Sequence, residues 1–423
     1  MKKTERKSEN GLIFLCWLVY ACSYLGKVNY SANITQIEKY FSVSHAEAGM
    51  VSTFFFFAYG IGQIVNGVLS GKYNTRLIVF FSLVISAISN LLVILVPVFS
   101  LIKFFWLVNG VALSVLWPCL IGTLGKSLPK SKMGKASNIM GTTVATGTVV
   151  IYGLSALFAA FDVFKLSFIT ATVSELAVAI VWFLFYNPFT KRAKEGAEAE
   201  EAAEVSASVA TAAQGAQKTK PSGGLLLTIC FLAIFCMATN LIKDGLTTWV
   251  PSILNETFSL PAAFSILITL ALPMLAIFAN AFAVKLHKKT PDFVLQNGIH
   301  FALAGLLTGV VIVCLSKEVF LPTIVGFALV NFFAGASNSL NTSVFPLFMK
   351  GKVNSGLMAG VLNGMCYVGS TISSYGFGAI ADLWGWMTVF YILLAVCAAL
   401  VLVAIGYEIG KAVLKRRTKI SAE

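Results

Sequence analysis

Long runs of apolar residues, each followed by a short polar segment, recur along the whole chain. Each run is long enough for a membrane-spanning helix, which needs roughly 20 predominantly apolar residues. Apolar and polar residues do not alternate within the runs, so a membrane β-barrel is excluded. Twelve runs are marked, at 11–36, 47–70, 76–97, 100–124, 135–159, 164–187, 225–251, 262–285, 292–315, 319–346, 355–381 and 385–410.

One long polar segment, 188–224, divides these runs into six and six. It is rich in Ala and Glu and then in Ser and Gly, a composition typical of a flexible tether with some helix. The sequence therefore predicts a first six-helix bundle at 1–187, a cytoplasmic linker at 188–224 and a second six-helix bundle at 225–423.

The composition agrees with this pattern and removes several classes of protein. Of 423 residues, 57% are apolar and 12% are charged, against about 25% charged in an average soluble domain. A soluble enzyme, a disordered protein and a receptor with one span are excluded. The eight cysteines all lie in apolar runs without a CxxC pair, so we expect buried small side chains and no metal site.

The net charge of +13 reflects where the basic residues lie relative to the spans. With the N-terminus in the cytoplasm, 25 of the 31 Lys and Arg residues fall on the cytoplasmic side, as the positive-inside rule requires. Four fall on the opposite side: Lys39, Lys103, Lys165 and Lys317. We therefore expect both termini to be cytoplasmic, in the inner membrane of the cell, and we expect no nucleic-acid partner.

The two remaining basic residues, Lys27 and Lys243, occupy equivalent places in the two halves. Ser23–Lys27 aligns with Thr239–Lys243, and Gly147 aligns with Gly369. Such repeats indicate two related bundles, with a substrate site near the middle of the membrane. Lys27 alone could instead extend to the membrane surface, but each lysine belongs to a polar helix face with the same spacing. These faces are Tyr20, Tyr24, Lys27 and Ser31, and Cys236, Asn240, Lys243 and Thr247.

Paired lysines at membrane depth predict an anionic substrate. Two ammonium groups in a medium of low dielectric constant repel each other and are poorly solvated, and a bridging anion relieves both costs. Asp244 has three interpretations: a salt-bridge partner of another helix, a modulator of Lys243, or a proton site. Glu175, in the sixth run, is interpreted as a buried protonated carboxyl or as a proton-coupling group.

Further polar residues at membrane depth are weaker candidates for substrate contact. Hydroxyl and amide groups also hold membrane helices together, and this alternative stays open for each of them. The candidates are Tyr24, Asn240, Gln63, Thr143, Asn338, Asn341 and Tyr367.

Several stretches resemble the organophosphate:phosphate antiporter branch of the major facilitator superfamily, which includes glycerol phosphate and hexose phosphate transporters. The resemblance implies an all-α membrane protein with the major facilitator fold, in which twelve transmembrane helices form two pseudo-symmetric six-helix bundles. The stretches are YLGKVN at 24–29, the segment 46–76, Trp117-Pro118, Trp249 with Pro251, 356–369, and GAIADLWGW at 378–386.

The resemblance also selects the two lysines. In those transporters an arginine of the first helix and another of the seventh hold the substrate phosphate, and they fall on Lys27 and Lys243. A lysine of the second helix falls on Gln63, a histidine of the fifth on Thr143, and an acidic residue of the seventh on Thr248. This site is therefore expected to be less positive than a phosphate site of the family. Its ligand is expected to carry less negative charge, as a carboxylate or phosphonate would, which counts against phosphate exchange.

We accordingly expect a monomeric secondary transporter of a small organic anion that works by rocker-switch alternating access. The alternative is a proton-coupled symporter of a sugar acid or another carboxylate. No cofactor and no ATP coupling are expected, since the chain has no GxxxxGK[ST] loop. An intramembrane enzyme is disfavoured because His45, His287 and His300 are scattered, the first two in expected loops. A sensor is disfavoured because the linker is too short for a docking domain.

Overall fold

The computed structural model describes residues 3–69, 72–207, 223–348 and 355–420. Within these ranges every regular element is helical and none is a strand. The helices are α1 Lys3–Ala32, α2 Ile34–Phe41, α3 His45–Leu69, α4 Thr75–Leu95, α5 Phe99–Ser114, α6 Leu116–Ser127, α7 Lys130–Met140, α8 Thr143–Ala160, α9 Leu166–Ala207, α10 Gly223–Phe258, α11 Ala262–Thr269, α12 Ala271–Ala276, α13 Ala279–Lys289, α14 Phe293–Ser316, α15 Phe320–Ser339, the π-helical η2 Leu340–Val344, α16 Phe345–Phe348 and α17 Ser355–Ile420.

Eleven helical stretches of the described residues are long and apolar enough to cross a membrane. A helix satisfies its own backbone hydrogen bonds, which is the condition for spanning lipid. Large apolar side chains such as Phe104, Ile180, Leu306 and Leu402 are more than half exposed on the outer faces. Exposure of this kind is unfavourable in water and is expected against lipid.

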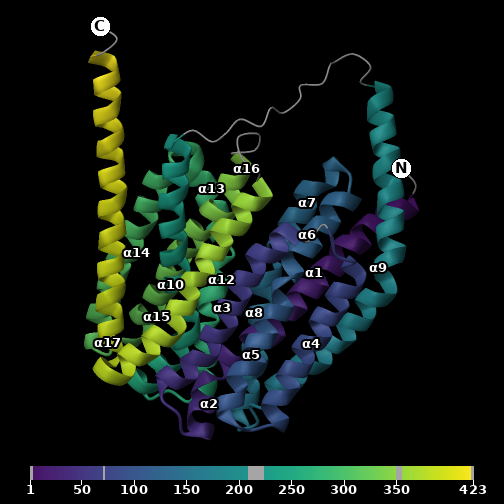
Figure 1. The fold of residues 1–423 in the computed structure, drawn as a ribbon. Helices are drawn as coiled ribbons and strands as arrows, with labels where there is room; N and C mark the ends of the chain where they lie inside the picture. The colour runs from purple at the N-terminus through teal and green to yellow at the C-terminus, as the bar shows by residue number, and fades with distance from the viewer. Residues whose placement is uncertain (1–2, 70–71, 208–222, 349–354, 421–423) are drawn as a thin grey trace. The chain divides into compact units, whose positions relative to one another are not determined.

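The last of these stretches, Gly360–Val413, contains two spans. It has 54 residues, and a straight helix of that length would be roughly 80 Å long, far more than the ~30 Å hydrocarbon core. Gly385 has φ 77° and ψ 165°, which breaks the helix, and α17 folds back there (Figure 1). The two predicted runs at 355–381 and 385–410 lie on either side of this turn, so the expected twelve spans are accounted for.

The described chain divides into two compact units. Unit 1 comprises Met1–Gln36 and Phe54–Gln217. Its central helix is α1, which packs against α8 and α9, while α4 packs against α5 and α9 (Figure 1). Helix α9 continues beyond the expected end of the sixth run at 187 and reaches Ala207, because the Ala, Lys and Glu residues that follow are strong helix formers.

Unit 2 comprises Ile37–Thr53 and Lys218–Glu423. Here α17 packs against α10 and α14, and α15 packs against α10, α12 and α14. The segment Ile37–Thr53 contains the end of α2 and the first turns of α3, so this part of the first half of the chain packs with the second unit.

Candidate functional site

Aromatic rings surround the amine of Lys27 inside unit 1. The side chain is on α1 and is only 7% exposed. Its Nζ lies 4.0 Å from the ring centroid of Tyr59 and 4.8 Å from that of Tyr24, and 5.8 Å from that of Phe55. Aromatic faces attract a cation through their quadrupole and bring no negative charge of their own. Such contacts stabilise an ammonium group at membrane depth.

The rings around Lys27 are themselves fixed by their neighbours. The hydroxyls of Tyr20 and Tyr59 lie 3.4 Å apart, and the Tyr20 ring packs on Trp117 at 4.7 Å between centroids. A side chain at Gly147 would overlap the backbone of α1 and Tyr24. The glycine therefore permits the close approach of α8 to α1 at the level of Tyr24.

A buried polar cluster lies directly beside Lys27. The carbonyl oxygen of Gly26 accepts hydrogen bonds from the side-chain amides of Asn109 at 2.8 Å and Asn90 at 3.3 Å. Glu175 is fully buried, and its Oε1 accepts a hydrogen bond from Ser86 at 2.8 Å. A side chain at Gly26 would overlap both Glu175 and Asn90. Because Gly26 has no side chain, Glu175 can lie next to the turn of α1 that carries Lys27. Glu175 is the only acidic residue of the sixth run.

In unit 2, Lys243 forms an ion pair with its neighbour Asp244. The Nζ to Oδ1 distance is 3.2 Å, and the two side chains are 28% and 17% exposed. The other carboxylate oxygen of Asp244 accepts hydrogen bonds from Asn240 at 3.0 Å and from Ser370 of α17 at 2.6 Å. The ion pair of Asp244 is therefore within its own helix, and its contact with another helix, α17, is a hydrogen bond and not the salt bridge considered above.

The same network continues into α15. Asn338 donates a hydrogen bond to Asn240 at 2.9 Å and also contacts the sulfur of Cys366 at 3.4 Å. The structure thus brings together three of the residues that the sequence selects in unit 2: Lys243, Asn240 and Asn338. Cys236, on the predicted polar face of α10, belongs instead to an apolar cluster.

Three of the four other candidate residues make hydrogen bonds that hold helices together, and the fourth is Tyr367. The side-chain amide of Gln63 donates to the Ser114 carbonyl at 3.1 Å, and the hydroxyl of Thr143 donates to the Met140 carbonyl at 2.6 Å. Asn341, in the π-helical turn, exchanges two hydrogen bonds with Asn297 at 2.8 and 3.1 Å. Tyr367 is buried on α17. For Gln63, Thr143 and Asn341 the geometry is that of contacts between and within helices.

Unit 2 contains a cluster of charged residues around His45, here called the His45 centre, which was not predicted from the sequence. Nδ1 of His45 lies 2.8 Å from Glu38, and Nε2 lies 3.0 Å from Glu256. Glu256 also accepts a hydrogen bond from the Trp386 indole at 2.7 Å, and Asp382 accepts the backbone N–H groups of His45 and Ala46. Burial raises the pKa of Glu38, against the lowering effect of the hydrogen bond from His45.

This centre connects the segment Ile37–Thr53 to α10 and α17. The expectation that His45 and His287 lie in loops is wrong. His45 is the first residue of α3, where Asp382 caps the helix, and His287 is buried in the last turn of α13. No group of three or more His, Cys, Asp or Glu in the described part of the chain is placed to hold a metal ion.

The family model of the Major Facilitator Superfamily matches residues 16–346, which is more than half of the chain. The chain therefore belongs to the Major Facilitator Superfamily, and it is a multi-pass membrane transporter and not an enzyme. A bacterial homolog of the human lysosomal transporter Spinster, solved in an inward-facing and occupied conformation, has a TM-score of 0.71 at 13% identity, covering 96% of this chain and 97% of that one. This likeness confirms the fold.

Relatives named "Sugar phosphate exchanger 3" confirm the resemblance to the organophosphate:phosphate antiporter branch. The protein of Homo sapiens is 22% identical over 420 residues, which cover 89% of this chain and 83% of that protein. The protein of Xenopus laevis is 26% identical over 148 residues, covering 32% of this chain and only 28% of that relative. The hexuronate transporter of Bacillus subtilis (strain 168) is 23% identical over 353 residues, which cover 82% and 79% of the two chains.

Proposed function

We propose that the protein is a secondary transporter of a small organic anion, with an organophosphate as the favoured substrate, and that Lys27 and Lys243 bind its anionic group. The observation that carries this proposal is the enclosure of the Lys27 amine by Tyr24 and Tyr59 in the interior of unit 1. A charge at this depth is costly and usually serves a ligand or a partner. Aromatic faces stabilise an ammonium group and add no negative charge that would repel an anion.

Lys243 is proposed to contribute the second positive charge, in competition with Asp244. Because Asp244 Oδ1 lies 3.2 Å from the Lys243 amine, an arriving anion shares the lysine with this carboxylate or displaces it. The unit 2 half of the site is therefore less positive than a lysine alone would make it. With Gln63 and Thr143 at the positions of two family cations, the site suits a singly or doubly charged small anion.

The favoured mode of transport is exchange by alternating access. Two of the relatives are named for sugar phosphate exchange, and the major facilitator fold supports alternating access between two repeats. We propose that the protein lies in the inner membrane as a monomer. The distribution of Lys and Arg supports a cytoplasmic position for both termini.

A second function is favoured by the Lys243–Asp244 pair. A proton that binds Asp244 would cancel its charge and release Lys243 for the substrate, so one proton would accompany one anion. This is the chemistry of a proton-coupled symporter of a sugar acid or another carboxylate. One relative is named as a hexuronate transporter, and hexuronates are sugar acids.

Reconstitution into proteoliposomes tests the proposal and separates the two modes. Uptake of radiolabelled hexose phosphates, phosphonates and hexuronates is measured with phosphate inside the vesicles, with an inward proton gradient, and with neither. Exchange predicts that internal phosphate accelerates uptake, whereas symport predicts acceleration by the proton gradient alone. Absence of saturable uptake for every anion in the panel, from protein that is correctly folded and inserted, would contradict an anion transporter.

A further inference from the structure

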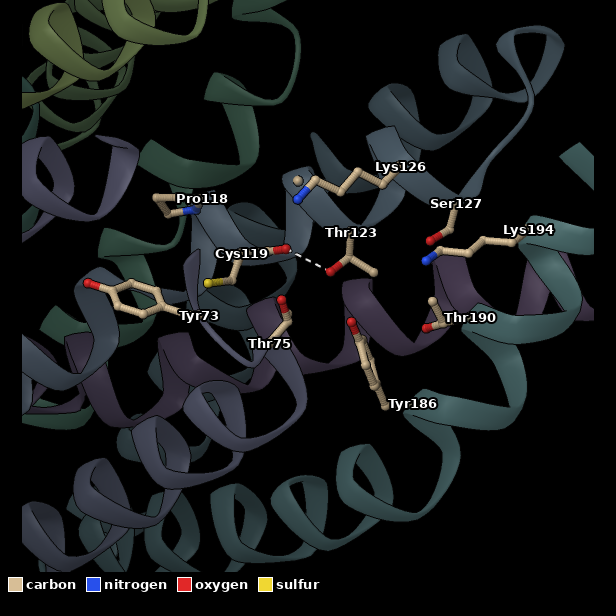
Figure 2. A pocket seen from close by; sticks show the side chains of 11 residues that line it. Tyr73, Thr75, Pro118, Cys119, Thr123, Lys126, Ser127, Tyr186, Thr190 and Lys194 are labelled. Carbon is tan, nitrogen blue, oxygen red and sulfur yellow. Dashed lines mark hydrogen bonds between the residues drawn. The ribbon is translucent and has the colours of Figure 1, made fainter. Parts of the chain in front are cut away.

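Unit 1 contains a basic cavity that is lined by none of the residues assigned above to substrate binding. Its volume is about 310 Å³. Residues from three parts of the unit line it (Figure 2): Tyr73 and Thr75 just before and at the start of α4; Pro118, Cys119, Gly122, Thr123, Lys126 and Ser127 on α6; and Tyr186, Thr190 and Lys194 on α9. These residues lie toward the ends of the predicted apolar runs that the distribution of Lys and Arg places on the cytoplasmic side.

The chemistry of the wall suits an anion with several oxygen atoms. Among its eleven residues, all of them described, two are lysines, Lys126 and Lys194, and none is acidic. Both lysines are exposed, so solutes or lipids can reach their amines. The remaining polar groups are four aliphatic hydroxyls and two phenols: Thr75, Thr123, Ser127, Thr190, Tyr73 and Tyr186.

Two of the hydroxyls are poised to donate a hydrogen bond. Ser127 is 1% exposed, and neither its Oγ nor the Oγ1 of Thr190 has a hydrogen-bond partner among the described residues. By contrast, the hydroxyl of Thr123 donates to the Cys119 carbonyl at 2.9 Å (Figure 2). A buried hydroxyl without an acceptor is unfavourable, and an anionic oxygen in the cavity would supply one.

The two amines and the two hydroxyls come from two different helices. Figure 2 shows the Lys194 side chain extending from α9 toward Ser127 of α6, with Thr190 one helical turn before Lys194. The positive-inside rule explains lysines at these helix ends. It does not explain why the hydroxyl oxygens of Ser127 and Thr190 are buried beside them without hydrogen-bond partners among the described residues, so the cavity requires a further explanation.

We propose that this cavity binds a phosphate group, with Lys126 and Lys194 neutralising its charge and Ser127 and Thr190 donating hydrogen bonds to its oxygens. Basic pockets between membrane helices at the cytoplasmic surface bind the headgroups of anionic lipids. Leu77, Ile121 and Phe185 are exposed on the same three helices and would contact acyl chains if the phosphate belongs to a lipid. A soluble phosphate compound would use the same polar groups without these apolar contacts.

Binding to the purified full-length chain in a neutral detergent tests the proposal. The two probes are didecanoyl phosphatidylglycerol and inorganic phosphate, and every protein carries Lys27→Gln and Lys243→Gln so that the proposed substrate site does not contribute. The test variant is Lys126→Gln/Lys194→Gln. The matched control is Lys191→Gln/Arg192→Gln, which removes two exposed charges from α9 outside the cavity. A third variant, Ser127→Ala/Thr190→Val, retains all charges.

We expect the test variant to weaken binding of at least one probe by about tenfold or more, since charge-assisted hydrogen bonds are the strong ones. The hydroxyl variant should weaken it several-fold, and the control should bind as the parent does. Binding of phosphatidylglycerol alone identifies a lipid headgroup, and binding of inorganic phosphate identifies a soluble ligand. Equal affinities in all variants, or equal losses in the test and control variants, would overturn the proposal. If the test variant does not fold, the hydroxyl variant Ser127→Ala/Thr190→Val is compared with the control instead. An affinity equal to that of the control would overturn the proposal.

Discussion

Asp244 is bonded at once to the amine of Lys243, the amide of Asn240 and the hydroxyl of Ser370. The carboxylate has two tasks, because it lowers the net charge of the proposed unit 2 half-site and also ties α10 to α17. Asparagine at this position would keep a hydrogen-bonding side chain of the same shape and would lose only the charge. The substitution therefore separates the electrostatic task from the structural one.

Asp244→Asn is predicted to raise the affinity for the anionic substrate. Because Lys243 no longer shares its charge, the dissociation constant should fall by about 1.5-fold to fivefold, the range for a partly exposed ion pair. If proton coupling operates at Asp244, the pH dependence of binding should also disappear. Equilibrium binding to the purified protein measures both effects, with Glu318→Gln, an exposed charge of the same unit, as the control. A variant that is folded but binds no better than the parent would argue against competition by Asp244.

Asp292 shows how a charged residue can contribute to stability outside the candidate site. It caps α14 by accepting hydrogen bonds from the backbone N–H groups of Val294 and Leu295, and it pairs with Lys411 of α17. Burial alone would raise the pKa of Asp292, but the hydrogen bonds from Lys411 and from the backbone outweigh it and hold the pKa below its ordinary value of 3.8. The carboxylate therefore stabilises the folded state above about pH 4, and this contribution is lost as the pH falls through the lowered pKa.

Asp292→Ala should reduce the free energy of unfolding by about 1–2 kcal/mol at neutral pH, because both cap and ion pair are lost. Asp292→Asn keeps a good capping side chain, so its loss should be below about 1 kcal/mol, as for other exposed pairs. Unfolding in detergent as a function of pH provides the measurement. The difference between the parent and the alanine variant should shrink below pH 4, and a difference that grows with acid would contradict the assignment.

At the residue level the sequence identified the charged members of the candidate site more readily than the neutral ones. Lys27 and Lys243 stand out because few charges lie at membrane depth and because they align between the halves. Tyr59 was less conspicuous, since a tyrosine in an apolar run is ordinary and its contact with Lys27 depends on the packing of α3 against α1. For the same reason Asn341 looked like a site residue, although it pairs with Asn297.

Among the helices, α17 depends on one residue for its change of direction. Gly385 has a backbone conformation that is essentially restricted to glycine. A Cβ at this position would meet no atom within 4 Å, so any cost of substitution arises from the backbone itself. The turn at Gly385 separates two spans that follow each other in one apolar stretch, Gly360–Val413.

Gly385→Ala is predicted to destabilise the protein by about 1–3 kcal/mol, the cost of forcing a residue with a side chain into this conformation. Gly406→Ala, in a helical part of α17 where a Cβ also meets nothing, should be neutral or stabilising by up to about 1 kcal/mol. The midpoint of unfolding in a denaturing detergent compares the two. Equal midpoints for both variants would show that the turn does not need a glycine.

The spans were predictable because the bilayer imposes the same requirement on every one of them, and the apolar runs locate them to within a few residues. The packing of Ile37–Thr53 with unit 2 was not predictable from the runs. It depends on contacts of His45 and Asp382, and of Glu38 with Ser252, which join residues more than 200 positions apart. Each of these polar residues taken alone resembles an ordinary surface residue at a helix end.

For the whole molecule, the proposal assigns one cation of the substrate site to each unit. Lys27 lies among aromatic rings in unit 1, and Lys243 lies beside a carboxylate in unit 2. The two positions are equivalent in the repeat but differ in their surroundings, so their substitution should have different consequences. Loss of Lys27 removes the positive charge of the unit 1 half of the proposed site, whereas loss of Lys243 leaves Asp244 without its ion-pair partner, and that carboxylate then repels an anion.

Uptake of a hexose phosphate into phosphate-loaded proteoliposomes by Lys27→Gln, Lys243→Gln and two control variants is the most direct test. The controls, Lys103→Gln in unit 1 and Lys317→Gln in unit 2, remove a lysine outside the candidate site. We predict that each site variant loses at least about 99% of the uptake rate, an effect of roughly 3 kcal/mol on a charge-assisted contact, while the controls transport at the parent rate. Parent-like uptake by both site variants, at equal amounts of inserted protein, would contradict the two-lysine site.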